Sequence, residues 1–242
     1  MVKEPKFTIS KKDDSPLWQT ILIKAVAVIL SLVVSALFLY FVTKLDPISV
    51  YASMYKGAFG TSRRFWITIR DAVFLLLVAV SLTPAFKMRF WNCGAEGQVL
   101  IGGLVTAALM INYGNTISTP VLLLIMFVTS AICGALWAFL PAYFKAKYNT
   151  NETLFTLMMN YVAIQLVEFF VDFWDKKQAH SVGIINMNTH GGWFMSIGEY
   201  QYLLNVIIVL LISIIVYIYL KYSKHGFELA VVGESEATAK YA

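Results

Sequence analysis

Three short stretches of this 242-residue chain place polar residues where an apolar helix is expected. In the first, Asn92, Glu96 and Gln98 belong to the sequence Asn-Cys-Gly-Ala-Glu-Gly-Gln, at the start of a long apolar run. A carboxylate inside a membrane is costly unless it is paired or hydrated, so Glu96 is a candidate for a solute pathway. A glycine-started helix can also expose backbone polar groups to a transported solute. The alternative stays open that Glu96 only caps the helix start, where the helix dipole favours negative charge.

The second stretch covers residues 149–161. Asn149 followed by Glu152 resembles a capping box and predicts that a helix starts here. Glu152, Thr156 and Asn160 lie four residues apart, so they share one face of that helix. A polar stripe on an apolar helix is expected to face other helices or a pore rather than lipid. We identify Asn160 as the first candidate for a functional residue.

The third stretch is the tail, residues 224–242. Gly226 is predicted to end the preceding helix, and Ser235 is predicted to cap a short helix whose first turn carries Glu236. Such a surface helix after a membrane span is, by itself, typical of a plain connector.

The chain shows no pattern typical of catalysis or of metal binding. Cys93 and Cys133 lie in apolar surroundings, and neither they nor the three histidines have metal-ligand or redox spacing. The sequence also lacks the Gly-x-x-x-x-Gly-Lys-Ser/Thr loop that cradles nucleotide phosphates. We therefore expect no enzyme activity, no cofactor and no metal in this chain.

Composition indicates which elements must position these residues. Hydrophobic residues make up 59% of the chain and charged residues only 14%, whereas soluble domains carry about 25% charged residues. Residues 97–144 contain no Asp, Glu, Lys or Arg, which is long enough for two crossings at ~20 residues each. Because helices satisfy their own backbone in lipid, we predict an all-α, polytopic transmembrane bundle of about six spans. These are residues 17–43, 72–86, the run from the glycine-rich stretch 94–97 to about 111, then 120–144, 153–171 and 202–220.

The basic residues favour one orientation. With residues 1–16 as a cytoplasmic N-terminal tail, twelve Lys and Arg residues fall on the inside and seven on the outside, as the positive-inside rule favours. This location between apolar runs also argues against nucleic acid as the reason for the net charge of +5. Residues 44–70 mix basic and aromatic side chains, which indicates a segment in the membrane interface. The polar connection 172–201 would face outward, where it could contact a delivery protein or serve as a solvated connector.

Together the three stretches resemble the permease family of bacterial ABC importers for nucleosides, simple sugars and related solutes. Residues 92–98 resemble its Asn-Ile-Gly-x-Glu-Gly-Gln signature, with Cys93 in place of isoleucine. Residues 151–161 resemble its Asn-Glu-x-x-x-Thr-Leu-Met-x-Asn-Tyr. The tail resembles its Gly-x-x-Leu-Arg-Ala-Val-Gly-x-Asn-x-x-Ala-Ala-x-Tyr-Ala-Gly-Ile, with Ala230 and Ser235 at the arginine and asparagine positions. Three motifs in the expected order make the resemblance specific.

The resemblance implies roles and partners. Residues 17–242 would be an incomplete permease domain, because family members continue past Ala242 with more spans, and 224–242 would be its cytoplasmic coupling segment. A substrate pathway would include Asn92, Glu96, Gln98, Thr156 and Asn160. Contacts to an ATPase would involve Gly233, Glu234, Ser235, Ala237, Ala239 and Tyr241. The implied partners are an ABC ATPase subunit, a second permease subunit (identical or different), an extracytoplasmic substrate-binding lipoprotein and membrane lipid. The implied location is the bacterial cytoplasmic membrane, and the implied mechanism is ATP-driven alternating access.

Other classes of membrane protein remain as alternatives. A secondary transporter would need coupling-ion ligands or a proton relay, and usually an internal repeat, none of which stands out in the sequence. An intramembrane enzyme would need a nucleophile paired with a base, or a metal cluster, within the spans. A channel-type subunit for a small polar solute is not excluded by hydropathy.

Overall fold

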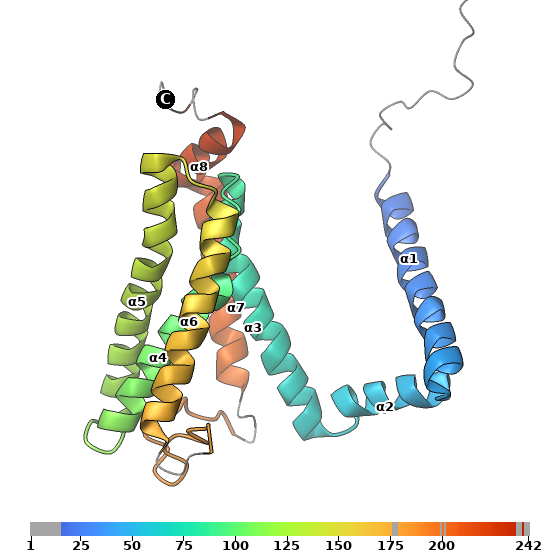
Figure 1. Cartoon of the computed structure of the whole chain (residues 1–242), viewed down its shortest axis with the longest axis horizontal. Coiled ribbons are helices and arrows are strands. Elements are labelled where there is room, and N and C mark those ends of the chain that lie inside the picture. The colour runs from blue at the N-terminus through green and yellow to red at the C-terminus, as the bar shows by residue number, and fades with distance from the viewer. Residues whose placement is uncertain (1–15, 176–178, 199, 201, 236–238, 240–242) are drawn as a thin grey trace, which may run out of the picture. The chain divides into compact units, whose positions relative to one another are not determined.

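The computed structural model describes residues 16–175, 179–198, 200, 202–235 and 239. This part of the chain is all-α (Figure 1). Six helices are long and apolar enough to cross a membrane, namely α1 with the π-helical segment that extends it, α3, α4, α5, α6 and α7. The predicted polytopic bundle with six spans is therefore confirmed. The elements are α1 (Leu17–Phe38), the π-helical Leu39–Thr43, α2 (Pro47–Phe59), α3 (Ser62–Lys87), α4 (Ala95–Tyr113), α5 (Thr119–Tyr148), α6 (Glu152–Trp174), α7 (Leu203–Tyr222) and α8 (Lys224–Glu234).

The chain divides into two compact units, with the boundary in the sequence between Phe65 and Trp66. In the first unit, the π-helical segment ends at Lys44, which has a left-handed backbone conformation with φ 58°. Asp46 then caps α2, its carboxylate accepting from the backbone N–H of Ser49 at 3.0 Å. Tyr51 of α2 donates its hydroxyl to the carbonyl oxygen of Leu32 at 2.7 Å, which fastens α2 to α1.

The region after α2 differs from the prediction. The second span was predicted as residues 72–86, but α3 has 26 residues, Ser62–Lys87. The charged residues before position 72 do not interrupt this helix, because arginine is a good helix former; Arg70 also pairs with the neighbouring Asp71 at 2.8 Å. Pro84 lies inside the helix rather than ending it. The predicted interfacial segment 44–70 thus divides between α2 and the start of α3, and its position in a membrane interface stays a prediction.

The second unit is built around α4, which packs against both α5 and α6. Few of the described side chains are buried there; the apolar ones include Ile101, Leu122, Met126, Ala163 and Val209. Many large apolar side chains are exposed on every long helix, as is expected where lipid rather than water surrounds the bundle. The chain is therefore a multi-pass membrane protein.

The end of the second unit corrects another prediction. Gly226 does not end the sixth span, because α7 ends at Tyr222 and Gly226 lies inside α8. The break is made by Ser223, whose extended backbone ends α7 and whose hydroxyl accepts from the N–H of Gly226 at 2.9 Å to cap α8. Ser235 follows α8, and its carbonyl accepts from the N–H of Ala239 at 3.0 Å. Glu236, Ala237 and Tyr241 lie outside the described residues.

Candidate functional site

The candidate site is the non-helical segment between α3 and α4, residues 88–94, together with the face of α6 that holds it. Arg89 takes up a left-handed conformation with φ 58°, and the chain then runs without regular structure to Gly94. Residues in such a segment leave backbone N–H and C=O groups without helical partners, and inside a membrane these groups need other partners. Residues 88–90 and Asn92 donate to backbone carbonyls of residues 84–90, whereas both backbone groups of Cys93 bond to side chains of α6.

Thr156 and Asn160 bind the segment through its backbone. The carbonyl of Cys93 accepts from Asn160 Nδ2 at 2.9 Å, and the N–H of Cys93 donates to Thr156 Oγ1 at 3.1 Å. Asn160 Oδ1 also accepts from the N–H of Gly97, in the first turn of α4, at 2.9 Å. Thr156 is 1% exposed and Asn160 7% exposed, so these bonds form away from solvent. The predicted polar stripe thus faces another part of the chain rather than lipid, which confirms that expectation.

Glu152 extends the stripe by one turn toward the start of α6. Its carboxylate forms an ion pair with Lys145 of α5 at 3.0 Å, and it lies near the backbone N–H of Trp91. The predicted capping box between Asn149 and Glu152 is wrong. Asn149 instead ends α5 in a left-handed conformation, φ 51°, which asparagine tolerates better than most residues. Asn151 is the residue that caps α6, accepting from the N–H of Leu154 at 3.0 Å.

Two glycines allow the segment to approach α6 closely. A Cβ at Gly97 would lie 2.9 Å from Asn160 Oδ1 and 3.2 Å from the Asn160 Cα. A Cβ at Gly94 would lie 3.0 Å from the Thr156 Cβ. Both glycines are buried. Their lack of a side chain is therefore what brings the backbone within hydrogen-bonding distance of Thr156 and Asn160.

The other predicted pathway residues lie around the same helix start. Asn92 accepts from the N–H of Gly94 at 2.9 Å and so shapes the turn into α4. Glu96 is in the first turn of α4, with its side chain exposed, and Gln98 is half-buried. Thr156 and Asn160 therefore bond to the backbone of the helix start that Asn92 shapes, while Glu96 remains on the exposed side of the helix.

Trp137 belongs to this cluster and was not predicted. Its indole Nε1 is buried and has no hydrogen-bond partner within the described part of the chain. It would lie 3.2 Å from a Cβ placed on Gly97, which puts it beside the Asn160 amide at the centre of the α4, α5 and α6 contact. An aromatic residue in the middle of an apolar run carries no sequence signal that distinguishes it from a lipid-facing one.

The predicted coupling segment lies against the other end of residues 88–94. Gly233 of α8 is buried and contacts the carbonyl of Lys87 so closely that a Cβ could not be accommodated. Lys87 Nζ in turn donates to the carbonyl of Leu220 in α7 at 2.8 Å. A cavity of about 750 Å³ separates this region from the end of α5. Its lining includes Arg89, Lys145, Glu152, Glu234, Ser235 and Ala239. Residues 88–94 therefore connect α8, which contacts their beginning, with the polar stripe of α6, which binds their end.

Comparisons with known proteins identify relatives of this chain. It is 29% identical to the guanosine ABC transporter permease protein NupP of Bacillus subtilis over 92% of this chain and 64% of NupP. It is 26% identical to the nucleoside ABC transporter permease protein NupB of Lactococcus lactis over 81% of this chain and 56% of that protein. It is also 29% identical to the glucose ABC transporter permease protein TsgB13 of Haloferax volcanii, over 52% of this chain and 33% of TsgB13. The chain thus spans less than two thirds of each of these relatives.

No solved structure shows a significant match. The family model described as branched-chain amino acid transport system / permease component matches residues 64–242, which contain all three motifs and the whole cluster around Asn160. Because this match covers most of the chain, and because the similar proteins are nucleoside and sugar ABC permeases, the chain belongs to that family of ABC transporter permease components.

Proposed function

We propose that this chain is a transmembrane permease subunit of an ATP-driven ABC importer that moves nucleosides, or alternatively simple sugars. The observation that carries the proposal is the family match over residues 64–242. The names of its relatives favour nucleosides, since two of them are described as guanosine and nucleoside permeases and one as a glucose permease. The chain itself has no phosphate-binding loop, so ATP hydrolysis takes place on a separate ABC ATPase subunit.

The proposal includes an arrangement in the membrane. Residues 1–16 are a cytoplasmic tail, residues 17–242 belong to the permease domain, and residues 224–242 are the cytoplasmic coupling segment. The membrane is the bacterial cytoplasmic membrane. An extracytoplasmic substrate-binding lipoprotein delivers solute on the outside, and a second permease subunit, identical or different, completes the pathway.

The contacts in the second unit support a route for alternating access. The coupling segment, with Gly233, Glu234, Ser235, Ala237, Ala239 and Tyr241, docks on the ATPase. Movement of α8 is passed through Gly233 to Lys87 and so to residues 88–94. These residues are held to α6 by hydrogen bonds, so α4 and α6 move with them. The solute pathway includes Asn92, Glu96, Gln98, Thr156 and Asn160. The last two also hold the start of α4 in place.

The experiment that tests this proposal is uptake by proteoliposomes that contain the full-length permease with its ATPase, partner subunit and binding protein. We expect uptake of radiolabelled guanosine that requires ATP and is insensitive to ionophores. Uptake driven by an ion gradient without ATP would show a secondary transporter, and passive equilibration would show a channel. ATP-dependent uptake of glucose in preference to guanosine would keep the importer and change its substrate.

A further inference from the structure

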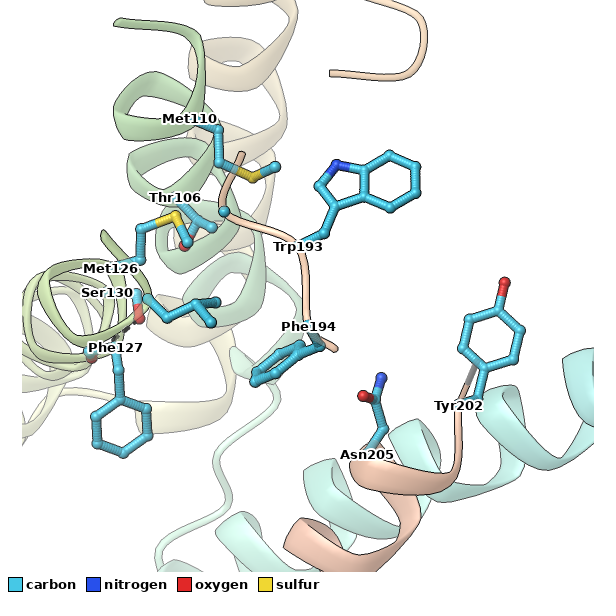
Figure 2. Close-up of a pocket in the computed structure, with 11 residues that line it drawn as sticks. Thr106, Met110, Met126, Phe127, Ser130, Trp193, Phe194, Tyr202 and Asn205 are labelled. Carbon is cyan, nitrogen blue, oxygen red and sulfur yellow. Dashed lines mark hydrogen bonds between the residues drawn. The ribbon is translucent and has the colours of Figure 1, made fainter. Parts of the chain in front are cut away.

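A second cavity lies at the opposite end of the helices from α8, and none of the sequence motifs contributes to it. It has a volume of about 430 Å³ and lies between α4, α5, the start of α7 and the loop before α7 (Figure 2). Pockets for small molecules usually measure about 300–1,000 Å³. Its walls are largely methionine and aromatic side chains, including Met110, Met126, Trp193 and Phe194. The size and the walls therefore suit a small, flat ligand.

The loop that forms one wall is held firmly in place. Asn186 Nδ2 donates to the carbonyls of Met110 and Gly191, each at 2.9 Å, which fastens the loop to the end of α4. Gly192 is buried with φ +81°, and a Cβ there would lie 3.1–3.2 Å from side-chain atoms of Met110 and Met126. Trp193 Nε1 donates to the carbonyl of Ile185 at 3.0 Å. The ring of Trp193 is thus positioned by bonds within the loop, and its indole N–H is already used.

One polar group in this pocket has no partner. The Oδ1 atom of Asn205, in the first turn of α7, is buried and accepts no hydrogen bond within the described residues. Figure 2 shows the Asn205 amide facing the space beside Phe194. A buried acceptor without a donor is unfavourable. A rotation of the Asn205 side chain into the cavity would bring Oδ1 within reach of a ligand N–H or O–H group and remove this cost.

The remaining lining restricts the charge of the ligand. None of the described residues that line the pocket is Asp, Glu, Lys or Arg. The nearby Arg70 lies over the ring of Tyr202 at 5.3 Å, but it is paired with Asp71 at 2.8 Å. A zwitterionic amino acid would have to bury two charges here without partners, which is strongly unfavourable. A sugar ring inside the pocket would bury several hydroxyl groups against few polar side chains, which is also unfavourable, so the sugar ring of a larger ligand would stay outside it.

We propose that this pocket binds an uncharged planar ring that donates an N–H group to Asn205 Oδ1 and packs against Trp193, Phe194, Met110 and Met126. Methionine sulfur and aromatic faces both contact planar rings favourably. This inference rests on the proposed function, in which the ring is the base of a nucleoside. The inference places the binding site for the base at this end of the bundle, separate from the Asn160 cluster. It assigns Asn205 as the residue that determines specificity for the base.

The test compares two nucleosides that differ in their base N–H groups. Guanosine carries N–H donors on its base, whereas purine riboside has the same ring system with none. Binding of each radiolabelled probe is measured, without ATP, to membrane vesicles that contain the assembled transporter with the full-length permease. We expect guanosine to bind about tenfold more tightly than purine riboside, the ratio that one hydrogen bond of ordinary strength provides.

Asn205→Leu is expected to abolish this ratio while purine riboside binds as before, which also shows that the variant is folded. Asn115→Leu, at an exposed position in the turn between α4 and α5, is the matched control and should keep the ratio. Equal binding of both probes to the wild type, or an unchanged ratio in Asn205→Leu, would overturn the pocket proposal. ATP-dependent uptake in the same vesicles is scored separately, so an importer whose uptake is intact but whose binding ignores Asn205 refutes only the pocket.

Discussion

Replacement of Asn160 by leucine should destabilise the second unit, because one side chain satisfies two backbone groups from another part of the chain. The change removes the bonds to the carbonyl of Cys93 and from the N–H of Gly97, each 2.9 Å long. A buried backbone group without a partner costs about 1–3 kcal/mol. Side-chain hydrogen bonds between membrane helices average about 0.6 kcal/mol. For two bonds we therefore expect the free energy of unfolding to fall by about 1 to 6 kcal/mol.

The free energy of unfolding would be measured on the full-length permease in micelles, by titration with sodium dodecyl sulfate and circular dichroism at the helical band. Gln165→Leu is the matched control. It lies on the same helix and is exposed, and its side-chain amide donates to the exposed Glu168 at 2.9 Å. A difference between Asn160→Leu and Gln165→Leu below about 0.5 kcal/mol, the usual scatter between independent surface changes, would refute the reasoning.

A double-mutant cycle makes the same test sharper. Thr156→Val removes the acceptor for the N–H of Cys93, while Asn160→Leu removes the donor to its carbonyl. If both side chains hold the same segment, the first change already loosens it and the second costs less. The two effects should then differ from additivity by more than about 0.5 kcal/mol. Strict additivity would show that the two residues act independently.

Three further predictions concern the glycines and the loop. Gly97→Ala should lower the free energy of unfolding by about 1–3 kcal/mol through overpacking. Gly103→Ala is the control and should be neutral or stabilising, because no atom lies within 4 Å of the new Cβ. Equal effects of the two changes in the same titration would contradict the close approach of Gly97 to α6. Gly233→Arg should abolish solute-stimulated ATPase activity of the assembled transporter while membrane insertion persists. The reason is that α8 can no longer pack on the end of α3. Normal ATPase activity would refute the coupling role of α8. His180 bonds to Asp172 at 2.8 Å, and this bond raises the pKa of His180 above its ordinary value of 6.5. The charged pair is therefore lost as the pH rises through the raised pKa of His180. Asp172→Asn should lower the pKa of His180 measured by NMR. An unchanged pKa would exclude the pair.

The polar stripe of α6 could be predicted because it depends on spacing alone. Residues four apart share a helix face, and a polar face on an apolar helix needs partners away from lipid. The identity of those partners could not be predicted, because Cys93 and Gly97 are more than sixty positions away in the sequence. Trp137 joined the cluster without any warning from the sequence. Such contacts depend on how α4, α5 and α6 pack together.

Local sequence signals gave wrong helix ends at positions where two nearby residues could each cap or end a helix. Asn149 and Asn151 can each cap a helix, and the structure uses Asn149 to end α5 and Asn151 to begin α6. Gly226 can end a helix, but Ser223 already provides the break, and Gly226 is used for close contact with the end of α7. The second span was predicted too short because charge marks where a helix leaves lipid, not where it ends, and arginine is a good helix former.

The sequence by itself determined that this protein is a helical membrane protein, where its spans lie to within a few residues in most cases, and which family its motifs resemble. These properties follow from local composition, because in lipid each apolar segment must satisfy its own backbone and can do so only as a helix. The tertiary structure alone decided that α6 holds residues 91–97 by their backbone, that α8 meets the end of α3, and that a pocket forms around Asn205. Each of these depends on which donor meets which acceptor across distant helices, and packing geometry sets that pairing.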